Sequence, residues 1–388
     1  MKAVRYLESK VHFFEDSFVR AVALMVGMAI GAGILAMPYV IYKAGFWTGM
    51  LVLAFIGFTI MLMHLYIGEI ALRTEGRHQL VGYVEKYLGS NAKKILTFSM
   101  LFMLNGALVA YIIGEGAALK AIFGGDSFAF SMIFFVVMAI ITLFSLKVIT
   151  ESEVVIGLAM MVTIFLICFF SSFHINFDNY QGFDITKFFI PYGVIFFAVV
   201  SGGAIPPMKA VLERSKGKLK KAIILGTLIP LVVYAFFSVI VVGVVGETFN
   251  VLEQGVVTVA LGLVLGKYMN VFTNLFAVFS MSTSFIAMAL IMKWVYQYDY
   301  GMRKSLAWLL TCMIPLGIVL LNVTTFVRVL SLIGAIGGGI EGIMIILMHY
   351  KAKKLGDRKP EYSLPNNIFL SALLICVFVV GVVVTILM

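Results

Sequence analysis

Two short stretches of the sequence interrupt apolar runs with residues that free backbone hydrogen-bonding groups. The first is GMAIGAGILAMP, Gly27 to Pro38, within the apolar run 17–42. Glycine weakens a helix interior through its conformational freedom, and proline does so through its missing N–H. A helix unwound inside a bilayer exposes N–H and C=O groups that lipid cannot satisfy. A polar ligand can satisfy them, so this stretch predicts a binding site made largely of main-chain atoms.

The second stretch is VVSGGAIPPMKAV, Val199 to Val211, within the run 187–213. Gly31 and Gly202 lie 171 residues apart, and the four runs that follow each stretch repeat with similar offsets. Five runs make an odd number, so the second unit enters the membrane from the opposite face. An interrupted helix at the same place in two inverted repeats indicates the central site of a transporter. The alternative is that the glycines only permit close helix packing.

The freed groups suit an amino acid zwitterion, which needs donors for its carboxylate and acceptors for its ammonium group. The N–H groups of Ala32, Gly33 and Ile34 are the expected donors, because a half-helix points its positive end at the break. The carbonyl groups of Ala29, Ala198 and Val199 are the expected acceptors. Further expected substrate contacts are Gly31, Ser201, Gly202, Gly203, Asn105 and Tyr111.

Ionisable residues inside the apolar runs are the candidates for carrying a proton, because placing a charge there is costly. Glu341 is the deepest, eight residues before His349. Glu115 lies near the outer end of its run, where an interfacial position is the alternative, and His64 is a weaker candidate of the same kind. Glu69 lies four residues before Arg73, which predicts a local ion pair instead.

The elements that position these residues are membrane-spanning helices. The chain has 388 residues, of which 62% are hydrophobic and 12% charged, and its mean hydropathy is +1.07. A soluble domain cannot bury that apolar share, whereas a bilayer needs about 20 apolar residues per helix. We therefore predict an all-α polytopic membrane protein with eleven transmembrane helices. The expected spans are 17–42, 46–72, 95–120, 127–147, 153–173, 187–213, 220–245, 267–294, 305–322, 326–350 and 367–387.

The basic residues predict the orientation of these spans. With the N-terminus inside, nearly all of the 29 lysines and arginines fall on the cytoplasmic side; the exceptions are Lys43, Lys120, Lys187, Lys267 and Arg328. Such asymmetry is typical of cytoplasmic loops. We expect a multi-pass plasma-membrane protein with a cytoplasmic N-terminus and an extracellular C-terminus. Its expected parts are a cytoplasmic segment 1–16, two repeats over 17–173 and 187–350, and a last helix over 367–387.

The stretch IGAGILAMP, followed by Ala44–Gly45, resembles the first-helix signature of the amino acid/auxin permease family. Within that family it is closest to the tyrosine/tryptophan permeases, and STSFIAMAL, Ser282 to Leu290, resembles their TSF segment. The resemblance covers ten spans in layout and only these motifs closely. It implies the LeuT-like fold of the amino acid–polyamine–cation superfamily, with broken first and sixth helices, and secondary transport of amino acids.

The same resemblance implies a cation site between the first and eighth helices. Its oxygens would come from carbonyls near Gly27, Ile30 and Ser280 and from the hydroxyls of Thr283 and Ser284. These hard ligands suit Na⁺, although hydroxyls in membrane helices often bond their own backbone instead. The coupling ion is thus Na⁺ or H⁺, and the sequence favours Na⁺ narrowly.

Other functions fit the sequence less well. No catalytic or Cys/His metal cluster is visible, so neither an enzyme nor a cofactor is expected. The basic residues are spread over short loops, which excludes a nucleic-acid surface, and no obligate protein partner is expected beside the lipid bilayer. Neither break carries a charged residue within a turn on its membrane side, so the substrate is expected to be a neutral amino acid, aromatic or large aliphatic by the resemblance. An exchanger or a nutrient sensor using the same site remains the alternative.

Overall fold

The computed structural model describes residues 16–76, 78–143 and 149–388, and the described part of the chain is helical without β-strands. Residues 1–15 of the expected cytoplasmic segment and residues 144–147 of the fourth expected span lie outside the described residues. Side chains are described from residue 159 onward in the fifth expected span.

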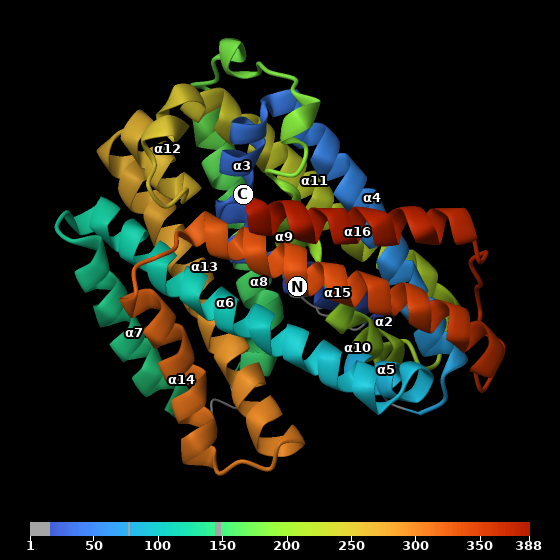
Figure 1. The fold of residues 1–388 in the computed structure, drawn as a ribbon. Helices are drawn as coiled ribbons and strands as arrows, with labels where there is room; N and C mark the ends of the chain where they lie inside the picture. The colour runs from blue at the N-terminus through green and yellow to red at the C-terminus, as the bar shows by residue number, and fades with distance from the viewer. Residues whose placement is uncertain (1–15, 77, 144–148) are drawn as a thin grey trace, which may run out of the picture.

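The elements follow each other along the chain as a series of helices joined by short loops (Figure 1). The first half contains α2 (Ser17–Ala29), η1 (Ala32–Leu35), α3 (Met37–Ala44), α4 (Phe46–Arg73), α5 (Leu80–Leu88), α6 (Ser90–Phe123), α7 (Ser127–Leu143), α8 (Ile149–Ser172), η2 (Phe177–Asn179) and η3 (Ile185–Lys187). The second half contains α9 (Tyr192–Val199), η4 (Gly202–Ala204), α10 (Ile205–Val211), η5 (Lys216–Lys218), α11 (Leu219–Val245), η6 (Gly246–Val251), α12 (Val257–Leu265), α13 (Lys267–Trp294), the π-turn η7 (Val295–Asp299), α14 (Lys304–Leu320), α15 (Phe326–Leu355) and α16 (Ile368–Leu387).

Helices that are long and apolar enough to cross a membrane dominate this series. Seven such helical stretches occur among the described residues, and shorter apolar helices, such as α7 and α14, accompany them. Each of the eleven expected runs falls on one or more of the helices, within the described residues. The predicted class, an all-helical polytopic membrane protein, is therefore confirmed.

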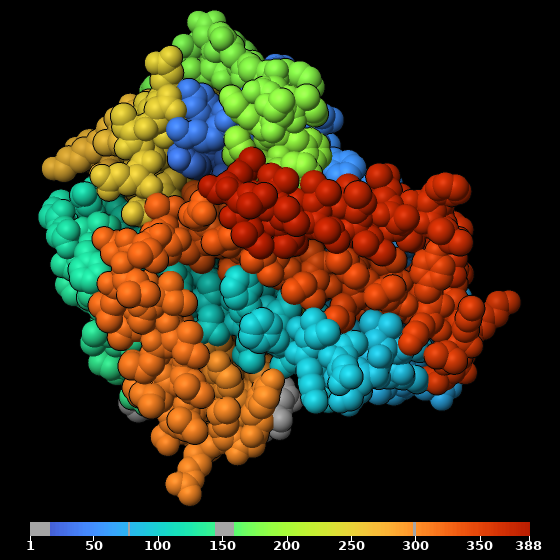
Figure 2. Space-filling model, viewed as in Figure 1, coloured from blue at the N-terminus to red at the C-terminus, as the bar shows by residue number. Residues whose placement is uncertain are grey.

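The long helix α15 lies at the centre of the packing. It contacts α4, α6, α9 and α16, and the ribbon shows α6, α15 and α16 running side by side (Figure 1). The last helix, α16, lies beside α15 on the visible face of Figure 2, where α15 and α6 are also exposed to view. Glycines make these close approaches possible. A Cβ built on Gly339 would lie 2.8 Å from Val382 on α16.

The segment between α15 and α16 ties the end of α4 to its neighbours. Buried Glu69 accepts a bond from Arg73 at 2.9 Å, which confirms the predicted local pair. The same carboxylate also binds His349 Nε2 at 2.9 Å and accepts the Leu364 N–H at 2.7 Å. A buried carboxylate needs such compensation. These hydrogen bonds therefore explain how a carboxylate is tolerated in the interior at Glu69, and they tie it to α15 and the segment after it, not to the breaks.

Candidate functional site

The first helix is broken where the sequence predicts. Helix α2 ends at Ala29, Ile30 is extended with ψ 100°, and Gly31 is extended with φ −146° and ψ −158°. The chain then forms the short turn η1 before α3 begins, with Pro38 in its first turn. The Ile34 N–H is used within η1, where it donates to the Gly31 carbonyl at 3.3 Å. Ala32 and Gly33 begin η1, and the first N–H groups of a helix have no acceptor within it.

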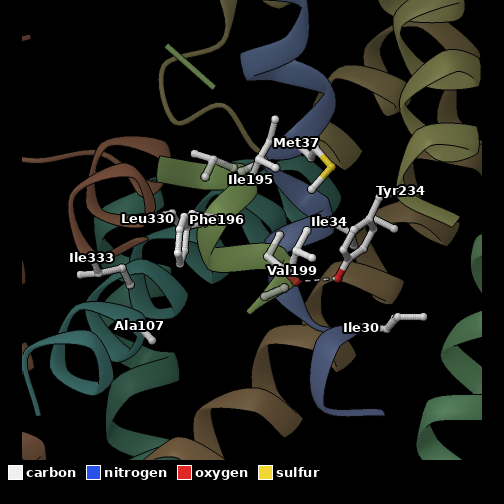
Figure 3. Packing of buried hydrophobic residues seen from close by; sticks show 14 of the residues in the cluster. Ile30, Ile34, Met37, Ala107, Ile195, Phe196, Val199, Tyr234, Leu330 and Ile333 are labelled. Carbon is white, nitrogen blue, oxygen red and sulfur yellow. Dashed lines mark hydrogen bonds between the residues drawn. The ribbon is translucent and has the colours of Figure 1, made fainter. Parts of the chain in front are cut away.

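The sixth helix is broken in the same way. Helix α9 ends at Val199, Val200 and Ser201 link it to η4, and α10 follows with two prolines at its start. The two breaks touch each other. A Cβ built on Gly33 would lie 2.7 Å from the Ala198 Cβ and 2.8 Å from the Ala198 Cα. Figure 3 shows Ile34 and Val199 side by side at this junction.

Tyr234 on α11 joins the two breaks through its hydroxyl group. Its oxygen lies 2.5 Å from the Ala29 carbonyl and 3.1 Å from the Ala198 carbonyl, and the side chain is fully buried (Figure 3). These are two of the three carbonyls expected to receive the substrate ammonium group. The sequence does not indicate this role for Tyr234, because a single tyrosine in the run LVVYAFF has no pattern that separates it from a core residue.

His64 on α4 holds the backbone of the second break. Its Nε2 lies 3.2 Å from the Ser201 N–H, and its Nδ1 lies 3.0 Å from the Thr227 hydroxyl. The Thr227 hydroxyl donates its own proton to the Ile223 carbonyl at 2.9 Å. Nδ1 must therefore be the donor to Thr227, and Nε2 must be the acceptor of the Ser201 N–H. His64 is thus a neutral imidazole that satisfies a main-chain donor freed at the break.

Glu341 on α15 faces the same break. A Cβ built on Gly202 would lie 3.3 Å from Glu341 Oε1 and 3.7 Å from His64 Cδ2. Both side chains line one small cavity, whose other lining residues are apolar. Gly203 and Ser201 lie beside them in the break: a Cβ on Gly203 would meet Met28 Cε at 2.9 Å, and the buried Ser201 hydroxyl oxygen has no partner among the described residues.

Helix α13 brings the Ser284 hydroxyl group close to Gly31 in the first break. A Cβ built on Gly31 would lie 3.5 Å from Ser284 Oγ, and the Tyr111 hydroxyl interacts with Ser284. Thr283 instead donates to carbonyls of its own helix, those of Phe279 at 2.9 Å and Ser280 at 3.1 Å. The structure therefore brings Gly31, Tyr111 and Ser284 together and turns the Thr283 hydroxyl proton away from them.

The remaining expected ion ligands differ in their surroundings. The Ser280 hydroxyl is buried and has no partner among the described residues, and the Ile30 side chain is buried. Gly27 is exposed near the end of α2, and a Cβ built on it meets nothing within 4 Å.

Two expected residues on α6 lie in positions that the sequence did not predict. Glu115 is fully buried among protein side chains and accepts a bond from Ser282 at 2.9 Å. Its other oxygen has no partner among the described residues. Asn105 donates to the Leu101 carbonyl at 2.8 Å and interacts with Tyr296, at the end of α13. The structure does not bring Asn105 to the breaks.

Comparison with known proteins gives this site its context. The family model of the tryptophan/tyrosine permease family matches residues 14–388. The chain belongs to the tryptophan/tyrosine permease family. It is 24% identical over 387 residues to the tyrosine-specific transport system 1 of Haemophilus influenzae, a match covering 95% of each chain. It is also 24% identical to glutamine transporter 2 of Aliivibrio fischeri, over 81% of this chain and 83% of that one.

A solved structure shows the same fold. The crystal structure of MhsT in complex with L-phenylalanine aligns with a TM-score of 0.65 and 14% identity, covering 95% of this chain and 97% of that one. This likeness supports the LeuT-like fold, and the two broken helices fit it. The chain is therefore a multi-pass membrane protein of an amino acid transporter family, not of an enzyme family, as the sequence predicted.

Within this permease, the residues divide into three groups around the breaks. Main-chain groups of Ala29, Gly33 and Ala198 form the junction, with Tyr234 bonded across it. The α13 hydroxyls lie beside Gly31, and His64 with Glu341 lies beside Gly202. A ligand in the junction would thus have a candidate cation site and a candidate proton site as neighbours.

Proposed function

We propose that this permease is a secondary active symporter for a neutral amino acid with an aromatic or large aliphatic side chain. The observation that carries the proposal is the contact of two broken helices at one junction. This contact brings together the main-chain N–H groups at the start of η1 and the Ala29 and Ala198 carbonyls, both of which the Tyr234 hydroxyl contacts. These groups match the carboxylate and ammonium groups that every amino acid carries. Alternating access of the junction to the two sides of the membrane would move the substrate.

The preference for a large apolar side chain has two supports. The residues beside the junction include Ile34, Phe196 and Val199, all buried and apolar (Figure 3). A charged substrate side chain would need a compensating charge in such surroundings. The relatives named for tyrosine and the L-phenylalanine-bound structure agree with an aromatic substrate. Because one relative is named for glutamine, a substrate with a neutral polar side chain is the second candidate.

Uptake by purified protein in liposomes tests this function. We expect labelled L-tyrosine, L-phenylalanine or L-tryptophan to enter and to be displaced by one another, while L-lysine and L-glutamate compete at least about tenfold more weakly. Accumulation above the outside concentration under an imposed cation gradient identifies a symporter. One-for-one exchange without accumulation would instead identify an exchanger. Preferred uptake of glutamine would contradict the proposed side-chain class, and binding without movement would indicate a sensor.

The proposed topology has eleven membrane spans, a cytoplasmic N-terminus and an extracellular C-terminus in the plasma membrane. The two proposed repeats, 17–173 and 187–350, would be inverted relative to each other. The structure gives a way to test the orientation, because α11 has 27 residues and is therefore about 40 Å long. Lys220 lies at its start, while Asn176 N–H bonds Gly243 O at its end and so places Asp178 there.

Cysteine labelling in a background without native cysteines checks the orientation. We expect a membrane-impermeant maleimide added to intact cells to label Asp178→Cys and to leave Lys220→Cys unlabelled until the membrane is opened. Both positions are exposed, so accessibility in the folded protein does not limit either reaction. The reverse pattern would invert the whole topology, and equal labelling of both would exclude an odd number of crossings between them.

Two cation sites are compatible with symport. The first is the Na⁺ site expected from Ser280, Thr283, Ser284 and carbonyls of the first break, of which Ser284 lies next to Gly31. The second uses a proton, with Glu341, Glu115 and His64 as candidates. The Thr283 hydroxyl donates its proton to its own helix, which leaves its oxygen lone pairs free to accept, so this bond does not decide between the two cations.

A further inference from the structure

Glu341 is a half-buried carboxyl group inside an apolar helix, without a bonding partner among the described residues. It lies near the middle of α15, and no hydrogen bond or ion pair to it occurs in the described part of the chain. The cavity that it lines has room for about one water molecule, and His64 is the other polar residue in its wall. An ionised carboxylate in these surroundings would lack a cationic partner, so the neutral acid is the favoured form here.

His64 cannot take this proton without disturbing the second break. Its Nε2 accepts the Ser201 N–H at 3.2 Å, while its Nδ1 proton is engaged by Thr227. A protonated imidazole has two donors and no acceptor, so Ser201 would lose its partner. The neutral ring is therefore tied to the conformation of the break that the structure shows.

Glu341 and His64 meet at Gly202, the residue that follows Ser201. A Cβ at Gly202 would contact both side chains, so each of them lies against the main chain of the break. Loss of the Glu341 proton would place a carboxylate next to main-chain N–H groups that the unwound helix has freed. That carboxylate would compete with His64 for these donors, because charge-assisted hydrogen bonds are the stronger ones.

We propose that Glu341 is the proton-carrying group of this permease. His64 holds the sixth-helix break in the observed position while Glu341 is protonated. This rests on the proposed transport function. Glu341 takes up one proton from water on one side of the membrane when substrate binds and releases it on the other side after substrate leaves. With Glu341 neutral, the sixth-helix break keeps the conformation that binds the substrate. With Glu341 ionised, its carboxylate binds main-chain N–H groups of the break and changes that conformation.

Other titratable groups near α15 already have partners or lie elsewhere. On α4, Tyr66 stacks on His349, and Glu69 bonds both His349, about 12 Å further along α15, and Arg73. On α6, Glu115 bonds Ser282 of α13. On α5, Lys86 bonds Asp357 at the end of the helix group. The remaining groups on the packed elements are Tyr192 on α9, Cys376 on α16, and Lys93, Lys94, Tyr111 and Lys120 on α6, together with Tyr83, Glu85 and Tyr87 on α5.

Two transport measurements in proteoliposomes with labelled L-tyrosine test the proton site and the transport function separately. One arm measures exchange at equal pH, and the other measures accumulation driven by an acidic exterior in sodium-free buffer. For Glu341→Gln we expect exchange within about threefold of the wild type and an accumulation ratio that falls to about one. Glu85→Gln, a surface carboxyl paired with Lys93, should leave both arms unchanged.

Each result decides a different point. Accumulation retained in Glu341→Gln would overturn the proposal, as would loss in Glu115→Gln alone or a wild type that accumulates only under a sodium gradient. A wild type that exchanges no amino acid would overturn the transport function itself. If Glu341→Gln does not fold, proton uptake by the wild type on L-tyrosine binding in weak buffer still decides. No net uptake between pH 5 and pH 8 would overturn the proposal.

The positioning role of His64 has its own test. Glutamine can accept from the Ser201 N–H and donate to Thr227, whereas leucine can do neither. We expect His64→Leu to lower L-tyrosine affinity at least about tenfold and His64→Gln to restore most of that loss. The pH dependence of binding should persist in His64→Gln, because the proton resides on Glu341. Equal behaviour of the two variants would show that His64 only fills space.

Discussion

Tyr234→Phe is expected to weaken amino acid binding by about 5- to 150-fold while the protein still folds. The substitution removes the hydroxyl that lies 2.5 Å from the Ala29 carbonyl and 3.1 Å from the Ala198 carbonyl. A buried acceptor left without its donor costs about 1–3 kcal/mol, and 1.4 kcal/mol corresponds to a tenfold change in affinity. The loss appears in binding because these two carbonyls set how the broken helices face each other. Equilibrium binding of labelled L-tyrosine to the detergent-purified protein measures it.

The chain offers a matched control for this variant. Tyr180 donates its hydroxyl to the Val239 carbonyl at 3.0 Å, outside the junction. Tyr180→Phe thus deletes a similar bond and should leave L-tyrosine affinity within about twofold. If Tyr234→Phe bound L-tyrosine more tightly than the wild type, the hydroxyl would be a competitor of the substrate ammonium group. That result would contradict a positioning role.

The two breaks could be predicted because glycine and proline act on the chain locally. An unwound helix depends on residues such as Gly31, Gly202 and Pro206 themselves, so their order in the sequence is sufficient. The apolar runs were predictable for the same reason, since a span of the membrane requires a fixed length of apolar residues. These local rules gave the helical class and the place of the junction.

The partners of the breaks could not be predicted in the same way. Tyr234 reaches the junction from α11, and His64 reaches Ser201 of the second break from α4; each lies in an apolar run that has no distinguishing pattern. Which face of a long helix points at the junction depends on packing across the whole bundle. The partner of Glu115 has the same origin: its place near the helix end could not show that Ser282 of α13 bonds it.

Residue type also leaves open whether a polar side chain on a helix bonds locally or reaches a distant partner. Thr283 has the right type and place for a cation ligand, yet its hydroxyl bonds carbonyls three and four residues earlier. Asn105 bonds the Leu101 carbonyl in the same way. Short polar side chains on helices often choose such partners. Residue type alone therefore gives candidates for an ion or substrate site, and the structure has to show which side chains are turned toward it.

Gly33→Val is expected to abolish measurable amino acid binding while the protein still inserts and purifies. The structure sharpens the reason, because a Cβ at Gly33 would lie 2.8 Å from the Ala198 Cα, which is main chain and cannot rotate away. Valine adds two methyl groups beyond that Cβ, so the first and sixth helices must separate at their junction. The N–H groups of η1 and the Ala198 carbonyl then no longer face the same ligand. Binding of labelled L-tyrosine, at concentrations up to about a hundredfold above the wild-type dissociation constant, tests this.

The size of the substituent provides a graded series. Gly33→Ala places only the Cβ against Ala198 and should weaken binding less than valine does, since overpacking costs grow with added volume. Gly317→Val on α14 is the control, because a Cβ there meets nothing within 4 Å, and it should bind like the wild type. Wild-type affinity in Gly33→Val would mean that the junction tolerates separation and that the glycines serve helix packing elsewhere. A graded loss from glycine to alanine to valine, with the control unaffected, would locate the ligand at the contact between the two breaks.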